Sequence, residues 1–172
     1  PVYFKPLTRS IIEEILTVDF EINAAKARTA SRISSGNLKT AIRIASESES
    51  LSSNWALSLF SLADNENDLG YLELADVNKK YQTKDQIIDL LKYIRVFASD
   101  LGALSMNPAA EITNIDKIDI LQPIAIKHSG IADRLYDFLL FLEDLNRKIE
   151  GNVNLNLIMT NLYLHCKHLL NP

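Results

Sequence analysis

The side chains that could do chemistry are few in this sequence of 172 residues. The single cysteine, Cys166, excludes an internal disulfide and any zinc site that needs two or four cysteines. His165 and His168 lie three residues apart, a spacing at which one helix can offer two ligands to a metal ion. No Asp or Glu stands near them at metal-ligand spacing, so we interpret both as partly exposed residues of an amphipathic helix and predict no metal site.

Motifs for nucleotide binding and for acid–base catalysis are also missing. The five glycines are too widely spaced to form a phosphate-binding loop. The tyrosines are not interleaved with Lys or Arg, as a stacking surface for single-stranded nucleic acid requires. We predict no catalytic residue and no cofactor. Four carboxylates of one predicted helix are interpreted as its solvated face: Asp133, Asp137, Glu143 and Asp144.

The composition favours a helical protein. The sequence is 47% apolar and 23% charged, which is typical of a globular domain, and Gly and Pro number only five each. Apolar residues recur at intervals of three and four, so we predict an all-α fold. The predicted helices are 9–17, 24–34, 38–45, 55–62, 69–80, 85–104, 131–149 and 153–170, with a short strand within 2–7 and a loop over 105–119.

Several helix ends can also be predicted. The N-caps expected for the first three helices are Thr8, Asn23 or Glu21, and Asn37. Gly36 is expected to end a helix in the left-handed conformation. Near the end of the chain, Gly151 should end one helix and Asn152 or Asn154 should cap the last.

Charge and composition divide the chain in two. Residues 1–45 carry seven Lys or Arg against four Asp or Glu, whereas the rest carries 11 against 18. The balance changes sign at a Ser- and Glu-rich run without helical pattern, residues 46–53. We predict a first domain over 1–46, a linker over 47–52 and a second domain over 53–172.

Membrane insertion and secretion are not expected. No apolar run approaches the roughly 20 residues that span a bilayer. A secretory signal has a basic segment followed by an apolar one, and the sequence contains no such arrangement. We therefore predict a cytoplasmic protein that does not bind membranes.

The first 46 residues carry a specific order of motifs. The segment Phe4-Lys5-Pro6-Leu7 precedes a helix, and an Ala-rich helix then leads to a Gly turn and a third helix. This order resembles the small helical lid of AAA+ ATPases of the clamp-loader group, which opens after F-x-P-L and closes with A-x-x-S-x-G-x-x-x-x-A-L-x-L-A. The residues at or next to the places of that closing motif are Ala30, Ser34, Gly36, Ala41, Ile42, Ile44 and Ala45.

The rest of the chain extends the resemblance. Residues 91–101, and the run Asn152-Val153-Asn154 before a Leu-rich final helix, are similar to the collar of the bacterial DNA polymerase III delta-prime subunit. The resemblance thus covers the whole chain in layout. It implies a small helical AAA+ lid followed by a helical-bundle collar domain.

The resemblance also implies a role for Lys39. This residue stands where ATP-hydrolysing relatives carry the sensor-2 Arg, which reaches the phosphates of the nucleotide. Lys keeps the positive charge but cannot form the bidentate contact of Arg. The departure fits a delta-prime subunit, which does not hydrolyse ATP, so we expect no enzymatic activity from this chain. The ATP-binding core is expected before Pro1.

Partners follow from the same resemblance. Collar domains of five subunits form the ring that holds a clamp loader together during DNA replication. The expected partners are therefore other clamp-loader subunits, with the sliding clamp and DNA met only through the assembled complex. Helix 153–170 is apolar nearly all round, so we predict that a partner covers it together with helix 131–149, unless helices 85–104 and 131–149 cover it within the chain. The interface candidates are Leu155, Ile158, Leu162 and Leu169.

Two other functions stay open at this point. The same architecture could belong to an ATP-hydrolysing gamma/tau-type subunit or another AAA+ protein, and an intact P-loop upstream would indicate this. The chain could also be an unrelated small helical enzyme or ligand-binding protein. A well-formed pocket with convergent polar groups would favour that function.

Overall fold

The computed structural model describes residues 6–46, 51–65, 83–151 and 154–171. These residues form α-helices and one short 3-10 helix, with no strand among them, so the all-α prediction is confirmed. The predicted helix 69–80 and most of the predicted strand within 2–7 lie outside the described residues. None of the described helices is long and apolar enough to cross a membrane.

The residues group by their contacts into two compact units. Unit 1 comprises Pro1–Ser50 and Thr113–Asp116, and unit 2 comprises Leu51–Ile112 and Lys117–Pro172. The division after Ser50 falls inside the predicted linker, residues 47–52. The interpretation of these units as a lid and a collar stays a prediction.

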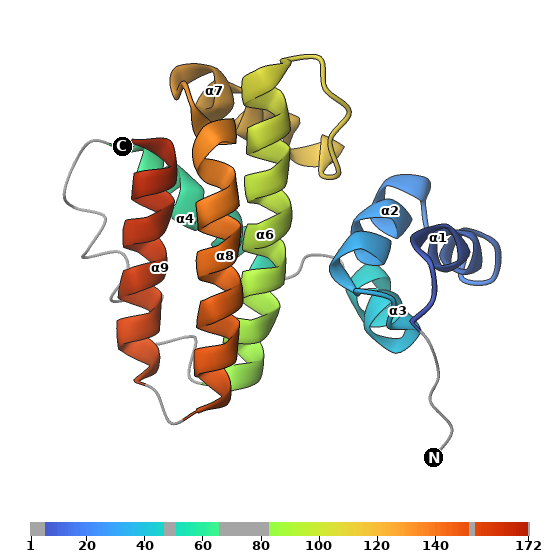
Figure 1. Ribbon diagram of the computed structural model, residues 1–172. Helices are drawn as coiled ribbons and strands as arrows, with labels where there is room; N and C mark the ends of the chain where they lie inside the picture. Colours follow the sequence, from blue (N-terminus) through green and yellow to red (C-terminus); the bar gives the residue numbers. More distant parts are fainter. Residues whose placement is uncertain (1–5, 47–50, 66–82, 152–153, 172) are drawn as a thin grey trace. The chain divides into compact units, whose positions relative to one another are not determined.

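Unit 1 contains three short helices, which Figure 1 draws in blue and cyan. They are α1 (Arg9–Val18), α2 (Ala24–Ile33) and α3 (Leu38–Ser46), each within one residue of the predicted bounds. Each helix contacts the other two. Half of their buried apolar side chains are alanines, which let the helix axes approach closely, and the other half are Ile or Leu: Ile12, Leu16, Ala27, Ala30, Ile33, Ala41, Ile44 and Ala45.

Two of the N-caps predicted in unit 1 are confirmed. The side chain of Asn23 accepts a hydrogen bond from the backbone N–H of Lys26 at 2.9 Å. That of Asn37 accepts one from the backbone N–H of Thr40 at 3.0 Å. These bonds satisfy N–H groups that have no partner within their own helix. Thr8 occupies the N-cap position of α1, but its side chain makes no capping bond.

The turn between α2 and α3 requires glycine. Gly36 has a φ of +87°, which confirms the predicted left-handed conformation. A Cβ added there would lie 2.5 Å from the Cβ of Pro6, closer than atoms can approach. The carbonyl of Gly36 also accepts a hydrogen bond from the backbone N–H of Leu7 at 3.0 Å. The glycine therefore lets the segment before α1 pack against this turn.

Unit 2 is a helical bundle. Its helices are α4 (Leu51–Asp64), α6 (Lys84–Met106), α7 (Ile118–Lys127), α8 (Ile131–Glu150) and α9 (Leu155–Leu170). Figure 1 shows α6, α8 and α9 side by side, with α4 behind them and α7 at one end. Helix α6 contacts α4, α7 and α8, and α9 contacts α4 and α8. Large apolar side chains fill the space between them, among them Phe60, Phe97, Leu101, Phe138, Leu162 and Tyr163.

The structure corrects the helix prediction in two places. Helix α4 begins at Leu51, inside the predicted linker 47–52, and not at residue 55. The predicted loop over 105–119 ends in a 3-10 helix, Ile115–Lys117, that leads directly into α7. Helix α7 was not among the predicted helices. It contains Pro123, and proline removes one backbone hydrogen bond from a helix interior. Three buried apolar side chains hold it against the bundle nevertheless: Leu121, Ile124 and Ala125.

Candidate functional site

Lys39, the residue that the resemblance placed near a nucleotide, is exposed in the first turn of α3. It makes no hydrogen bond or ion pair with another described residue, so its ammonium group is available to an anion. One exposed lysine is a point charge and does not form a nucleotide site by itself. A backbone loop that could cradle phosphates would have to come from elsewhere.

The predicted interface residues of α9 lie inside unit 2. Ile158, Leu162 and Leu169 are almost completely buried by the chain itself. The side chain of Leu155 lies outside the described residues. Helices α4 and α8 provide the cover that an apolar helix needs. A partner that bound α9 would therefore contact other residues, and whether one does stays a prediction.

Four apolar side chains of α8 and α9 remain exposed. The exposed fractions are 69% for Tyr136 and 46% for Leu140 on α8, and 55% for Leu157 and 42% for Leu164 on α9. These two helices contact each other and run side by side in Figure 1. Because isolated globular domains rarely collect large exposed apolar side chains on neighbouring elements, this surface is the candidate for binding a partner.

His165, one of the two histidines of α9, packs against α8. The ring of His165 stacks on Phe141 of α8, with 3.6 Å between ring centroids and 13° between planes. Burial, followed by the neighbouring charge of His168, lowers the pKa of His165 below its usual range. No group of three or more potential metal ligands occurs in the described part of the chain. His165 instead joins α8 to α9.

The four carboxylates of α8 differ in their surroundings. Glu143 forms an ion pair with Arg95 of α6 at 3.0 Å, and Asp144 forms one with Lys148 at 2.6 Å. The hydrogen bond from Lys148 lowers the pKa of Asp144, although slight burial opposes this change. Glu143 and Asp144 are therefore partners in surface ion pairs. Asp133 and Asp137 are exposed and form no ion pair with any described residue.

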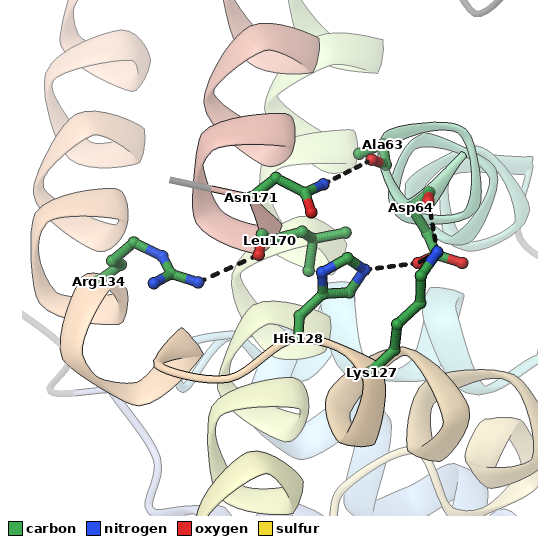
Figure 2. Close-up of polar contacts among 7 residues, drawn as sticks. All are labelled: Ala63, Asp64, Lys127, His128, Arg134, Leu170 and Asn171. Atoms are coloured by element: carbon green, nitrogen blue, oxygen red, sulfur yellow. Dashed lines mark hydrogen bonds and ion pairs between the residues drawn. The ribbon is translucent and has the colours of Figure 1, made fainter. Parts of the chain in front are cut away.

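A polar cluster at one end of the bundle was not predicted from the sequence (Figure 2). The Nε2 atom of buried His128 lies 2.6 Å from Oδ1 of Asp64, at the end of α4. Lys127 Nζ lies 3.0 Å from the same carboxylate and also donates to the carbonyl of Asp64. Burial opposes ionisation of Asp64, but the hydrogen bonds from His128 and Lys127 outweigh it, so the pKa of Asp64 lies below its ordinary value of 3.8.

Arg134 fastens two further helix ends in the same cluster. Its guanidinium donates to the carbonyls of Leu169 at 2.9 Å and Leu170 at 3.1 Å, at the end of α9. It also donates to the carbonyl of Ser129 at 3.0 Å, just before α8. A Cβ on Gly130, whose φ is +75°, would lie 2.9 Å from this guanidinium. The cluster therefore connects α4, α7, α8 and α9, and we call it the end joint.

The end joint serves structure, and sequence spacing does not reveal it. Asp64 and His128 are 64 residues apart, and Arg134 and Leu169 are 35 apart. The contacts given above use these polar groups to hold helix ends together. The joint fixes the relative positions of α8 and α9, and thereby the exposed apolar surface between them.

Comparison with known proteins identifies no relative. The chain matches no protein-family model, no curated protein and no solved structure.

Proposed function

We propose that this chain is the lid and collar of a clamp-loader subunit of the bacterial DNA polymerase III delta-prime type. It acts in DNA replication by protein–protein contact and has no catalytic residue of its own. Its partners are the other clamp-loader subunits, and it meets the sliding clamp and DNA only through the assembled complex in the cytoplasm.

The turn between α2 and α3 carries the proposal. The residues that resemble the closing motif of a clamp-loader lid fall on one helix–turn–helix of unit 1. The motif glycine, Gly36, occupies the left-handed turn that only glycine enters without strain. Lys39 then lies exposed in the first turn of α3, where a lid residue could approach a nucleotide held by another domain.

Unit 2 supports a role in assembly. Glu143 and Asp144 are held in surface ion pairs, and the polar groups of the end joint hold helix ends together. The exposed apolar side chains of α8 and α9 form one surface that no contact within the described residues covers. A subunit whose task is to bind its neighbours needs such a surface, whereas an enzyme would need a convergent polar site.

Reconstitution tests the proposal directly. The protein that contains this chain is mixed with the other purified clamp-loader subunits of the same organism, and the mass of the product is measured by size-exclusion chromatography with light scattering. We expect one complex whose mass includes this protein. If it elutes alone while the other subunits assemble among themselves, the proposed function is wrong. An unrelated helical protein of similar size serves as the control.

A second measurement tests the expected lack of enzymatic activity. The chain from Pro1 to Pro172 is purified and incubated with ATP and magnesium. We expect no phosphate release above a blank, and no difference between this chain and its Lys39→Ala variant, because a lone lysine cannot replace a phosphate-binding loop. ATP hydrolysis by the wild-type chain that is lost in the Lys39→Ala variant would contradict the proposal.

A further inference from the structure

The exposed surface of α8 has a regular arrangement. Asp133, Tyr136, Asp137 and Leu140 follow one another at steps of three, one and three residues, which places all four on one side of the helix. All four are exposed. Two apolar side chains thus alternate with two carboxylates along an outward strip, which we call the α8 strip.

The strip continues onto α9 across the seam between the helices. Leu140 precedes Phe141, and Leu164 precedes His165, and the rings of Phe141 and His165 stack at 3.6 Å. Leu140 and Leu164 therefore lie on either side of this seam, both exposed. The result is an apolar centre shared by two helices and bordered by acids on α8.

The end joint keeps this surface in one conformation. Arg134 lies between Asp133 and Tyr136 in the sequence of α8, and it donates hydrogen bonds to the last carbonyls of α9. The beginning of α8 is thereby fastened to the end of α9, next to the strip. A surface that is already ordered loses little conformational freedom when it binds, which favours tight association.

The charges decide what kind of partner fits. Asp133 and Asp137 have no ion-pair partner among the described residues, in contrast to Glu143 and Asp144 on the same helix. A second copy of this strip would bring like charges together, which opposes self-association. A partner that presents Lys or Arg around an apolar contact would neutralise both carboxylates as it covers Tyr136 and Leu140.

We propose that the α8 strip and Leu164 form the docking surface for a basic face of a neighbouring clamp-loader subunit. This inference rests on the proposed function and deepens it, because it states which surface binds and what chemistry the partner must have. It also replaces the buried side chains of α9 with exposed residues of α8 as the main contacts.

Two double variants of the whole protein test this assignment in the reconstituted clamp loader. Asp133→Lys with Asp137→Lys reverses the charge, and Tyr136→Ser with Leu140→Ser removes the apolar centre. We expect each to weaken association by about tenfold or more, since central apolar contacts and opposed charges dominate binding. The charge variant should also lose the decline of wild-type affinity with added salt.

Matched controls lie on α7. Ile126 is 65% exposed and Asp119 is exposed, so Ile126→Ser and Asp119→Lys make the same chemical changes outside the strip. Circular dichroism verifies that every variant is folded. Controls that bind like the wild type while both double variants bind weakly would support the assignment.

Other outcomes overturn it in distinguishable ways. If the wild type assembles and the double variants bind as tightly as the controls, the α8 strip is not the docking surface, and the proposed function is unaffected. If the wild type forms a homodimer and the double variants do not, the strip binds a second copy of this chain, and the proposed partner is wrong. Wild type that does not assemble with the other subunits overturns the proposed function and this inference together.

Discussion

Units 1 and 2 are both helical, but they pack by different means. Unit 1 packs three short helices around a core that is half alanine and half Ile or Leu, and the alanines allow close approach of the backbones. Unit 2 packs longer helices through aromatic and leucine side chains, with Phe60 and Phe138 at 6.5 Å between ring centroids. Unit 1 should therefore be sensitive to changes in backbone conformation, and unit 2 to changes in side-chain volume.

The two units also differ in how their helix ends are held. Unit 1 ends its helices with local devices, which are the capping bonds of Asn23 and Asn37 and the left-handed Gly36. Unit 2 also has local caps, at Thr83 and Asn154, but in addition it connects helix ends that are distant in sequence through the end joint, where His128 meets Asp64. Local devices leave a mark in the sequence, whereas long-range joints depend on the folded arrangement of several helices.

The largest effect is expected in the core of unit 2. Leu162→Ala removes a completely buried side chain and should lower the free energy of unfolding by about 2–5 kcal/mol, because a cavity remains. Urea unfolding followed by the fluorescence of the single tryptophan, Trp55 in α4, measures this. The control is Leu164→Ala two residues on, which is exposed and should change stability by less than about 1 kcal/mol. Equal effects of the two variants would contradict the packing of α9.

Unit 1 should show its own sensitivity at the turn before α3. Gly36→Ala forces a Cβ against Pro6 at a left-handed φ, so we expect a loss of about 2–4 kcal/mol from overpacking and backbone strain together. Hydrogen exchange of the amides of α2 and α3 reports the stability of unit 1 itself. Protection unchanged from the wild type would mean that the segment before α1 does not pack on this turn.

The end joint should give an intermediate effect that depends on pH. Asp64→Ala leaves buried His128 without its partner and should cost about 1–3 kcal/mol at neutral pH. Because the pKa of Asp64 is lowered in the folded state, its carboxylate stabilises the protein above its ordinary pKa of 3.8 and loses this contribution as the pH falls through the folded value.

Unfolding measurements across pH check that expectation. The difference in stability between wild type and Asp64→Ala should be full at pH 7 and should shrink in acid below pH 3.8. Asp119→Ala, which removes an exposed carboxylate of α7, should shift stability by no more than about 0.5 kcal/mol. A difference that grows in acid would show that Asp64 is not held by His128 and Lys127.

Unit 1 was the more predictable part, for a physical reason. Asn23, Asn37 and Gly36 act on their immediate neighbours, so residue type and position were enough to predict the caps and the turn. The bounds of α6, α8 and α9 followed from the spacing of apolar residues in the same way. These signals are local in the chain.

The candidate surface could be predicted only in part. The sequence indicated that α9 carries more apolar side chains than one face requires, but it did not indicate which of them the other helices cover. Ile158 and Leu162 proved buried and Leu157 and Leu164 exposed, because the positions of α4 and α8 decide this. Helix α7 and the end joint depend on contacts between residues far apart in the chain, so no local sequence pattern predicts them.

The smallest expected effect tests whether backbone conformation limits unit 1 outside Gly36. Glu21, in the turn between α1 and α2, has a φ of +53°, a conformation that strains any residue with a Cβ. Glu21→Gly should therefore stabilise unit 1 by about 0.5–1 kcal/mol, with the relief of strain exceeding the entropy that glycine adds to the unfolded chain. Hydrogen exchange of the α1 and α2 amides measures the change. Glu14→Gly, inside α1, should instead destabilise by about 1 kcal/mol, because glycine weakens a helix interior. If both variants destabilise unit 1 alike, the Glu21 side chain contributes a contact that outweighs its strain, and unit 1 depends less on backbone conformation than the comparison with unit 2 implies.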